Sequence, residues 1–224
     1  MVKKYIPMAN PLDEIDEKIN KDFIQGMVGN CWLLAAIKSL MIKNKGAKIL
    51  NDIVKILDDE NVKVSFKGYV KSYGISKKEL LEWKNLSIGD MDIRAIEIAR
   101  DRLLKELPNA YTSKLNGGNA SDAYEILIGN GEDIKIKSWK DFNLSLFNHQ
   151  ERAFVVANDS KENRIYSYLF GGRKYNLIGK HAYAVLGYED KKVYLSNPNK
   201  SAKILEIPLC IFENFFEELD VCYL

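Results

Sequence analysis

The chain has 224 residues, of which 46% are hydrophobic and 29% are charged. This length suits one domain with two lobes or two small domains, and the composition is that of a globular protein with a sizeable core. The 33 basic and 31 acidic residues nearly cancel, so neither nucleic acid nor a membrane surface is expected as the main partner. No stretch approaches the ~20 apolar residues of a membrane helix or resembles a signal peptide, which predicts a cytoplasmic protein.

The three cysteines and two histidines are too few and too scattered for a structural zinc site. No two cysteines have the Cys-x-x-Cys spacing, and three thiols cannot all pair with one another. We therefore expect reduced thiols, which allows one cysteine to act as a free nucleophile.

The first half of the chain is predicted to be mainly helical. Apolar residues recur at helical spacing over Cys31–Lys43, and a second helix is predicted over Ala47–Leu57. A strand at Val62–Phe66 and a long amphipathic helix at Asp92–Leu107 follow. After the flexible-looking 116–119 segment, the pattern predicts a short helix with Ser121 as cap and with buried Tyr124, Ile126 and Leu127.

The second half is predicted to be rich in antiparallel strands. A hairpin is expected from His181–Tyr188 and Val193–Asn197, which are rich in strand-forming residues. Other expected elements are strands at Ile134–Lys137, Arg152–Asn158, Arg164–Phe170, Ile204 onwards and Val221–Leu224, short helices at Phe142–Phe147 and Phe212–Leu219, and a loop at Gly171–Arg173. The fold class is therefore α+β, with approximate lobes 1–120 and 121–224 and a substrate cleft between them.

Cys31 opens the first predicted helix, directly after Asn30, which is a preferred N-cap residue. The free N–H groups and the dipole of a helix start favour an anion, so they would stabilise a thiolate. The backbone N–H of Cys31 and the side-chain amide of Gln25 could bind an oxyanion, and losing one such donor costs about 10²–10³ in rate. By itself, such a cysteine could equally be one that only packs.

The segment around this cysteine is more specific than the cysteine alone. Residues Gln25–Ala36 contain the pattern Gln-Gly-x-x-Gly-x-Cys-Trp-x-Leu-Ala-Ala, which closely resembles the active-site segment of the calpain family of cysteine peptidases. Further similarity to the calpain protease core covers Ile93–Leu104, Gly117-Gly118 and Ile204–Leu224. The resemblance implies a papain-like fold with two subdomains around a cleft and the hydrolysis of peptide bonds in protein substrates. It leaves the oligomeric state open.

His181 and Asn197 are the predicted partners of Cys31. His181 would take the proton of Cys31 or form an ion pair with its thiolate, and it would later protonate the leaving amine. Asn197 would accept a hydrogen bond from the ring. The order, with the cysteine early and histidine and asparagine late, suits papain-like enzymes. The other histidine, His149, lies in a polar segment and is expected to be exposed.

The two partners lie near the open end of the predicted hairpin, so its register decides whether they meet. A three-residue turn at Glu189–Lys191 or a bulge would place His181 and Asn197 on one face as diagonal neighbours, roughly 7–8 Å apart. A regular two-residue turn at Asp190–Lys191 would place them on opposite faces. The catalytic hypothesis therefore predicts the longer turn or a bulge.

Four positions mark further similarities to the family or departures from it. Gly117 and Gly118 resemble its Gly-Gly pair, whose backbone binds extended substrate, although a flexible turn explains them nearly as well. Lys180 precedes the histidine where the family usually has glycine, which could alter substrate approach. Asn199 stands where a tryptophan normally shields the His–Asn bond, so we expect that bond to be wetter here.

The resemblance to calpains raises the question whether this protein binds calcium as a cofactor. Asp22 and Glu97 are candidates for acidic ligands of the first calcium site in the calpain core, but solvated surface charges explain them at least as well. No EF-hand loop exists, and the acidic loop expected after Asn197-Pro198 is missing. We expect an enzyme that needs no cofactor, with Cys210, Cys222 and Trp32 in packing roles.

Two other functions remain compatible with the same residues. A transglutaminase-type acyltransferase uses the same three residue types, although the Gln25 motif favours a peptidase. A catalytically weak module of the same fold could bind peptides without cleaving them.

Overall fold

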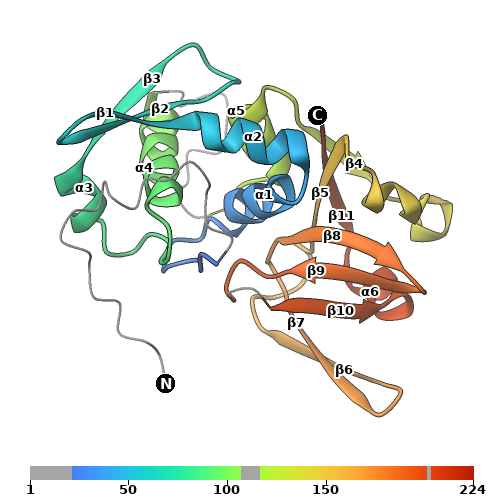
Figure 1. Cartoon of the computed structure of the whole chain (residues 1–224). Helices are drawn as coiled ribbons and strands as arrows, with labels where there is room; N and C mark the ends of the chain where they lie inside the picture. Colours follow the sequence, from blue (N-terminus) through green and yellow to red (C-terminus); the bar gives the residue numbers. More distant parts are fainter. Residues whose placement is uncertain (1–21, 107–116, 201–202) are drawn as a thin grey trace.

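The structure is a computed structural model that describes residues 22–106, 117–200 and 203–224. The first half of the chain folds as helices around a small antiparallel sheet, drawn in blue and green in Figure 1. The strands of this sheet have the order β1-β2-β3. The elements are α1 (Cys31–Met41), α2 (Asn44–Ile53), β1 (Val54–Asp58), β2 (Asn61–Ser65), β3 (Ser72–Ser76), α3 (Lys77–Glu82), α4 (Met91–Glu106) and α5 (Ala120–Ile128).

The predicted helices at Cys31–Lys43 and Asp92–Leu107 are confirmed as α1 and α4 within one or two residues. The prediction of a helix over Ala47–Leu57 is partly wrong, because α2 ends at Ile53 and the chain continues as β1. Val54 pairs with Val64 of the next strand. This pairing is a tertiary contact that outweighs the local helical pattern. The first half is thus less purely helical than its sequence suggests.

The second half is built on a six-stranded antiparallel sheet of order β10-β9-β8-β5-β11-β4. Beside it lies a separate two-stranded hairpin, β6-β7. The elements are β4 (Glu132–Lys135), the 3₁₀ turns η2 (Trp139–Asp141) and η3 (Leu144–Asn148), β5 (Arg152–Ala157), β6 (Ile165–Phe170), β7 (Arg173–Ile178), β8 (Tyr183–Glu189), β9 (Lys192–Ser196), β10 (Ile204–Pro208), α6 (Leu209–Phe215) and β11 (Glu218–Tyr223).

Several predictions for the second half need small corrections. The predicted loop at Gly171–Arg173 is a tight turn into β7, a strand that the sequence analysis missed. The predicted helix at Phe212–Leu219 lies earlier, as α6, because Glu218 onwards pairs with both β4 and β5. Ser121 lies inside α5 and not at its cap, which is Asn119, but Tyr124, Ile126 and Leu127 are buried as predicted.

Two hydrophobic clusters stabilise the chain. One surrounds α1 and α4 and includes Leu34, Ile37 and Tyr124. The other is rich in aromatic side chains, such as Trp139 and Phe212, and lies between the large sheet and α6. Helix α1 packs against both β5 and β8, so its N-terminal residue lies beside the segment that enters β8. Within the described ranges, no helix has the length and apolar character needed to cross a bilayer.

Candidate active site

One pocket of about 580 Å³ contains five of the residues predicted for the site. The start of α1 contributes Cys31, the preceding loop contributes Gln25, and the segment before β8 contributes His181. Gly117 and Gly118, which precede α5, complete this set. Residues that are distant in the sequence therefore meet at a single place.

Cys31 is half-buried at the first position of α1. The backbone N–H groups of Ala182 and Trp32 are close enough to the sulfur to lower the pKa of the thiol, but burial raises this pKa more strongly. The N–H groups at the helix start therefore favour the thiolate, as expected, but desolvation outweighs them. The neutral thiol is the favoured form of Cys31.

Asn30 occupies the predicted N-cap position, but its side chain has another role. Among the described atoms it accepts no capping hydrogen bond, and its amide donates to Glu97 Oε1 of α4 at 2.6 Å. The other oxygen, Glu97 Oε2, accepts from the Ser87 backbone N–H at 2.9 Å and from its hydroxyl. The buried carboxylate of Glu97 therefore connects the start of α1 to the 85–88 loop.

The same loop holds the segment that carries Gln25. Met27 N–H donates to Asn85 O at 2.8 Å, and Ile24 and Ile88 form a β-bridge. A Cβ on Gly26 would lie 2.2 Å from Leu86 O, so only glycine allows this close approach. The segment is consequently fixed against the loop that Glu97 also binds.

Gln25 contacts both the Cys31 side and the His181–Asn197 side of the pocket. Its backbone N–H donates to Pro198 O at 2.8 Å, next to Asn197. Its side-chain amide donates to Val28 O at 2.7 Å, which orients the amide and leaves its second N–H for another acceptor.

The predicted hydrogen bond between His181 and Asn197 is present, with 2.8 Å between His181 Nε2 and Asn197 Oδ1. Asn197 Oδ1 also accepts from the Asn199 backbone N–H at 2.8 Å. Because a backbone N–H needs an acceptor, this atom is the amide oxygen, and the proton of the first bond belongs to Nε2. The other ring nitrogen, Nδ1, is then the one that can accept a proton.

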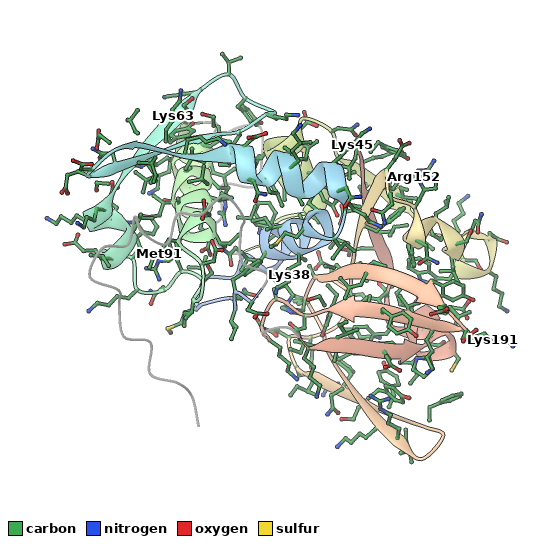
Figure 2. All side chains as sticks on the ribbon, viewed as in Figure 1. Lys38, Lys45, Lys63, Met91, Arg152 and Lys191 are labelled. Atoms are coloured by element: carbon green, nitrogen blue, oxygen red, sulfur yellow. The ribbon has the colours of Figure 1, made fainter. Side chains whose placement is uncertain are left out.

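The β8–β9 hairpin brings these two residues together by a bulge. The turn contains only Asp190 and Lys191, both at positive φ (48° and 60°), so the predicted three-residue turn is wrong. The register shifts between Val185 and Gly187, which confirms the bulge that was the other expectation. Figure 2 labels Lys191 at the turn end of this hairpin. Without the shift, His181 and Asn197 would point to opposite faces.

The bond between His181 and Asn197 is well shielded, with exposed fractions of 5% and 2% for the two residues. The expectation of a wetter bond is therefore wrong. Tyr183 packs edge-on against the imidazole at 5.0 Å between ring centroids. Burial lowers the pKa of His181, and the hydrogen bond to Asn197 partly opposes this by raising it. These shifts favour the neutral imidazole of His181 and the neutral thiol of Cys31.

The glycine positions have identifiable steric reasons. A Cβ on Gly118 would lie 2.6 Å from the Trp32 ring, so this glycine lets the chain pass against Trp32. Gly117 has φ +98° and donates its N–H to Gly29 O at 2.9 Å.

Lys180 has φ 49°, in the left-handed region that glycine adopts without strain. Its side chain is exposed at the pocket.

Glu97 does not fit the role of a calcium ligand. It is buried, and both of its oxygens accept hydrogen bonds from Asn30 and Ser87. The other candidate, Asp22, is exposed. In the part of the chain that the structure describes, no group of three or more acidic, histidine or cysteine side chains could hold a metal ion.

The other two cysteines and His149 lie apart from the pocket lining. Cys222 is buried, as expected for a packing residue. Cys210 is exposed on α6, so its expected packing role is wrong. His149 is exposed, as predicted.

Three acidic residues in the pocket wall were missed by the sequence analysis, namely Asp159, Glu218 and Asp220. Burial raises the pKa of Glu218 to about 7 and that of Asp220 to about 6. They come from the chain just after β5 and from its sheet neighbour β11. No local motif marks them, because strand pairing alone brings them to the pocket.

Comparison with known families supports the part of the site that contains Gln25 and Cys31. Residues 8–92 match the model of the calpain family cysteine protease, which confirms the predicted resemblance over that segment. The match includes Gln25 and Cys31 and ends before His181 and Asn197.

Among solved structures, a chain described as a C39-like peptidase from Bacillus anthracis is similar at 14% identity and a TM-score of 0.40. The similarity covers 93% of this chain and 98% of that one. At this distance it assigns neither fold nor activity. No curated protein sequence matches this chain.

Proposed function

We propose that this protein is a calpain-like cysteine endopeptidase that hydrolyses peptide bonds in protein substrates. The observation that carries the proposal is the buried hydrogen bond between Asn197 and His181, of which His181 lines the same pocket as Cys31. The match of residues 8–92 to a cysteine protease family supports it independently. The wider proposal is a papain-like fold whose two lobes, approximately 1–120 and 121–224, border the substrate cleft.

The reaction would begin from the neutral pair. His181 Nδ1 accepts the thiol proton as the Cys31 sulfur attacks the carbonyl carbon of the scissile peptide bond. Asn197 holds the ring through Nε2 and stabilises the imidazolium that forms. The carbonyl oxygen becomes an oxyanion, which the Cys31 backbone N–H and the free N–H of Gln25 Nε2 bind.

The tetrahedral intermediate then collapses to a thioester. The imidazolium gives its proton to the leaving amine as the C–N bond breaks. His181 next removes a proton from water, which attacks the thioester and releases the carboxylate product and the thiol. Backbone groups at Gly117 and Gly118 would bind the extended substrate beside Cys31. No step requires a metal ion or a cofactor.

Casein digestion by wild type and by Cys31→Ala, each with calcium or with a chelator, tests the proposal. We expect fragments from wild type in both conditions and none from the variant. Equal cleavage by the variant would contradict the central claim. Incorporation of a labelled amine into casein without fragments would instead indicate a transglutaminase-type acyltransferase.

Alkylation with iodoacetamide at near-neutral pH gives a second test that needs no substrate. Cys31 should react in wild type and more slowly in His181→Ala, because the base is missing. Cys210 is exposed and serves as an internal reference for an ordinary thiol, while buried Cys222 should stay unmodified. Equal rates for Cys31 in the two proteins would indicate that His181 does not activate it.

A further inference from the structure

The hairpin formed by β6 and β7 projects away from the large sheet, at the lower edge of the molecule in Figure 1. One of its faces packs on the protein, where Tyr166 and Tyr168 contact Phe215. Its paired residues alternate between this face and the opposite one. We refer to residues 165–178 as the projecting hairpin.

Apolar side chains are unusually exposed on the projecting hairpin. Leu169 is 78% exposed, Ile165 is 66% exposed, and Phe170 near the turn is 51% exposed. Grouped exposed apolar side chains, in contrast to scattered ones, mark interaction surfaces. This surface therefore fits a partner that carries apolar side chains of its own.

The projecting hairpin itself carries only positive charges. Residues 163–188 contain no aspartate or glutamate, but they contain Arg164, Arg173, Lys174 and Lys180. Arg164 contacts Glu162 at 3.4 Å, whereas Arg173 and Lys174 are exposed near the turn. Arg173 also lies over the Tyr175 ring at 5.3 Å. A partner with acidic side chains would match this charge.

The base of the projecting hairpin belongs to the pocket that contains Cys31. Asn163, just before β6, and Ile178, the last residue of β7, both line that pocket. A six-residue strand is about 20 Å long, so the turn lies about that far from the pocket wall. A polypeptide that leaves the pocket on this side passes along the hairpin.

Each strand of the projecting hairpin has an outer edge that pairs with no further strand among the described residues, although the Ile178 N–H at the base of β7 already donates to the Tyr183 hydroxyl at 2.8 Å. Within the described residues, β6 pairs only with β7, and β7 pairs only with β6. An extended peptide can join such an edge through backbone hydrogen bonds, and its alternate side chains then reach one face. Backbone, apolar and charged groups are therefore all available to the same extended segment.

We propose that the projecting hairpin binds an extended substrate segment in which acidic and apolar residues alternate, outside the residues held around the scissile bond. This proposal rests on the proposed peptidase function and specifies its substrate class. The binding energy comes from backbone pairing on a strand edge, from contacts of the apolar residues with Ile165 and Leu169, and from attraction of the acidic residues to Arg173 on the opposite face. Lys174 lies on the face of its register partner Leu169 and adds to the positive charge near the turn.

The test uses fluorogenic peptides with one cleavable core taken from a casein fragment. The core carries a six-residue extension on either side, either Glu-Leu-Glu-Val-Glu-Leu or Lys-Leu-Lys-Val-Lys-Leu. We expect the acidic extension on one side to lower KM roughly tenfold relative to the basic one, an effect that weakens at high salt. Equal KM values for all extensions would overturn the proposal.

Charge reversal in the projecting hairpin tests whether Arg173 and Lys174 cause the preference for the acidic extension. Arg173→Glu/Lys174→Glu should remove the preference, and Leu169→Ser should weaken binding of the acidic peptide at any salt concentration. The control Lys63→Glu/Lys67→Glu makes the same charge change at exposed lysines by the first sheet, which Figures 1 and 2 show far from the hairpin. This control should keep the preference, and loss of the preference in it would contradict the assignment.

Binding to the inactive Cys31→Ala protein, followed by fluorescence anisotropy, separates this proposal from the catalytic one. If no peptide is cleaved but the acidic peptide binds through Arg173 and Lys174, the peptidase proposal fails and the hairpin surface stands. If peptides are cleaved without any effect of the extension, only the hairpin proposal fails. A membrane surface is the alternative partner. The hairpin proposal would be overturned if the protein sedimented with phosphatidylserine vesicles in a way that depends on the hairpin and showed no preference for the acidic peptide.

Discussion

The two sides of the pocket are held in place by different kinds of interaction. On the Cys31 side, loops and a helix start are joined by buried side-chain hydrogen bonds, with Glu97 bound to Asn30 and Ser87. On the other side, His181 and Asn197 are positioned mainly by the backbone register of β8 and β9 and its bulge. The first side thus depends on a few polar atoms, whereas the second depends on strand pairing.

This difference predicts where substitutions change chemistry and where they change the fold. A side-chain change at Asn197 leaves the backbone register intact, so it should affect catalysis more than stability. A change within the Asn30–Glu97–Ser87 network alters the packing of α1 itself, so it should affect stability and activity together.

Asn197→Ala should have the largest effect of the three predictions that follow. We expect a loss of about 10² in kcat/KM, because the imidazole loses the acceptor that orients it. The melting temperature should fall modestly, because the Asn199 backbone N–H loses the same acceptor. The Asn197 bond raises the pKa of His181 in wild type. Its removal should therefore move the acid limb of the pH–rate profile to lower pH.

Asn199→Ala is the matched control, because Asn199 contributes only its backbone N–H to the bond at Asn197 Oδ1. It should retain most of the activity and the wild-type acid limb, which lies below about 6.5 since the pKa of His181 is lowered. An equal loss of activity in both variants would mean that the loop, and not the hydrogen bond, is what matters.

Asn30→Asp should have the next largest effect, on stability and activity together. The new carboxylate would face Glu97 Oε1 across the present 2.6 Å contact, and two buried carboxylates repel each other unless one is protonated. We expect a loss of about 2 kcal/mol in unfolding free energy at neutral pH. Burial already raises the pKa of Glu97. A proton bound at low pH relieves the repulsion, so the loss should shrink as pH falls and grow as it rises.

The double variant Asn30→Asp/Glu97→Gln tests this interpretation. In it, the new glutamine amide N–H on α4 donates to the new carboxylate at the start of α1, while the glutamine oxygen accepts from Ser87. The hydrogen bond between α1 and α4 is thus restored with the donor and the acceptor exchanged. Thermal unfolding at several pH values and the alkylation rate of Cys31 measure the recovery. If the double variant is no more stable than Asn30→Asp, the predicted pairwise contact is not what joins these elements.

Lys180→Gly should have the smallest effect. A non-glycine residue in the left-handed region costs about 1–2 kcal/mol, and the extra freedom of glycine in the unfolded chain offsets about 0.5–1 kcal/mol of that. We expect a gain of less than about 1 kcal/mol in denaturant unfolding, with kcat little changed. A clear loss of stability would show that the Lys180 side chain makes a contact that outweighs this backbone strain.

The sequence predicted some parts of the molecule well for local reasons. The helix that begins at Cys31 follows from its apolar spacing, and the motif from Gln25 identified the peptidase resemblance. The hydrogen bond between His181 and Asn197 was also predictable, because hairpin geometry allows only a few registers. The β1 strand and the exposure of Cys210 were not, since both depend on what packs beside a short apolar segment.

The sequence by itself determined which groups could act: one cysteine at a helix start, two histidines and a nearby asparagine. Only the tertiary structure decided how they are arranged. The bulge that replaces the expected longer turn is set by pairing along the whole hairpin, and the hydrogen bond from Asn30 goes to Glu97, 67 residues away, instead of to its own helix. Burial then raises the pKa of the Cys31 thiol, because desolvation outweighs the local N–H groups that a helix start provides.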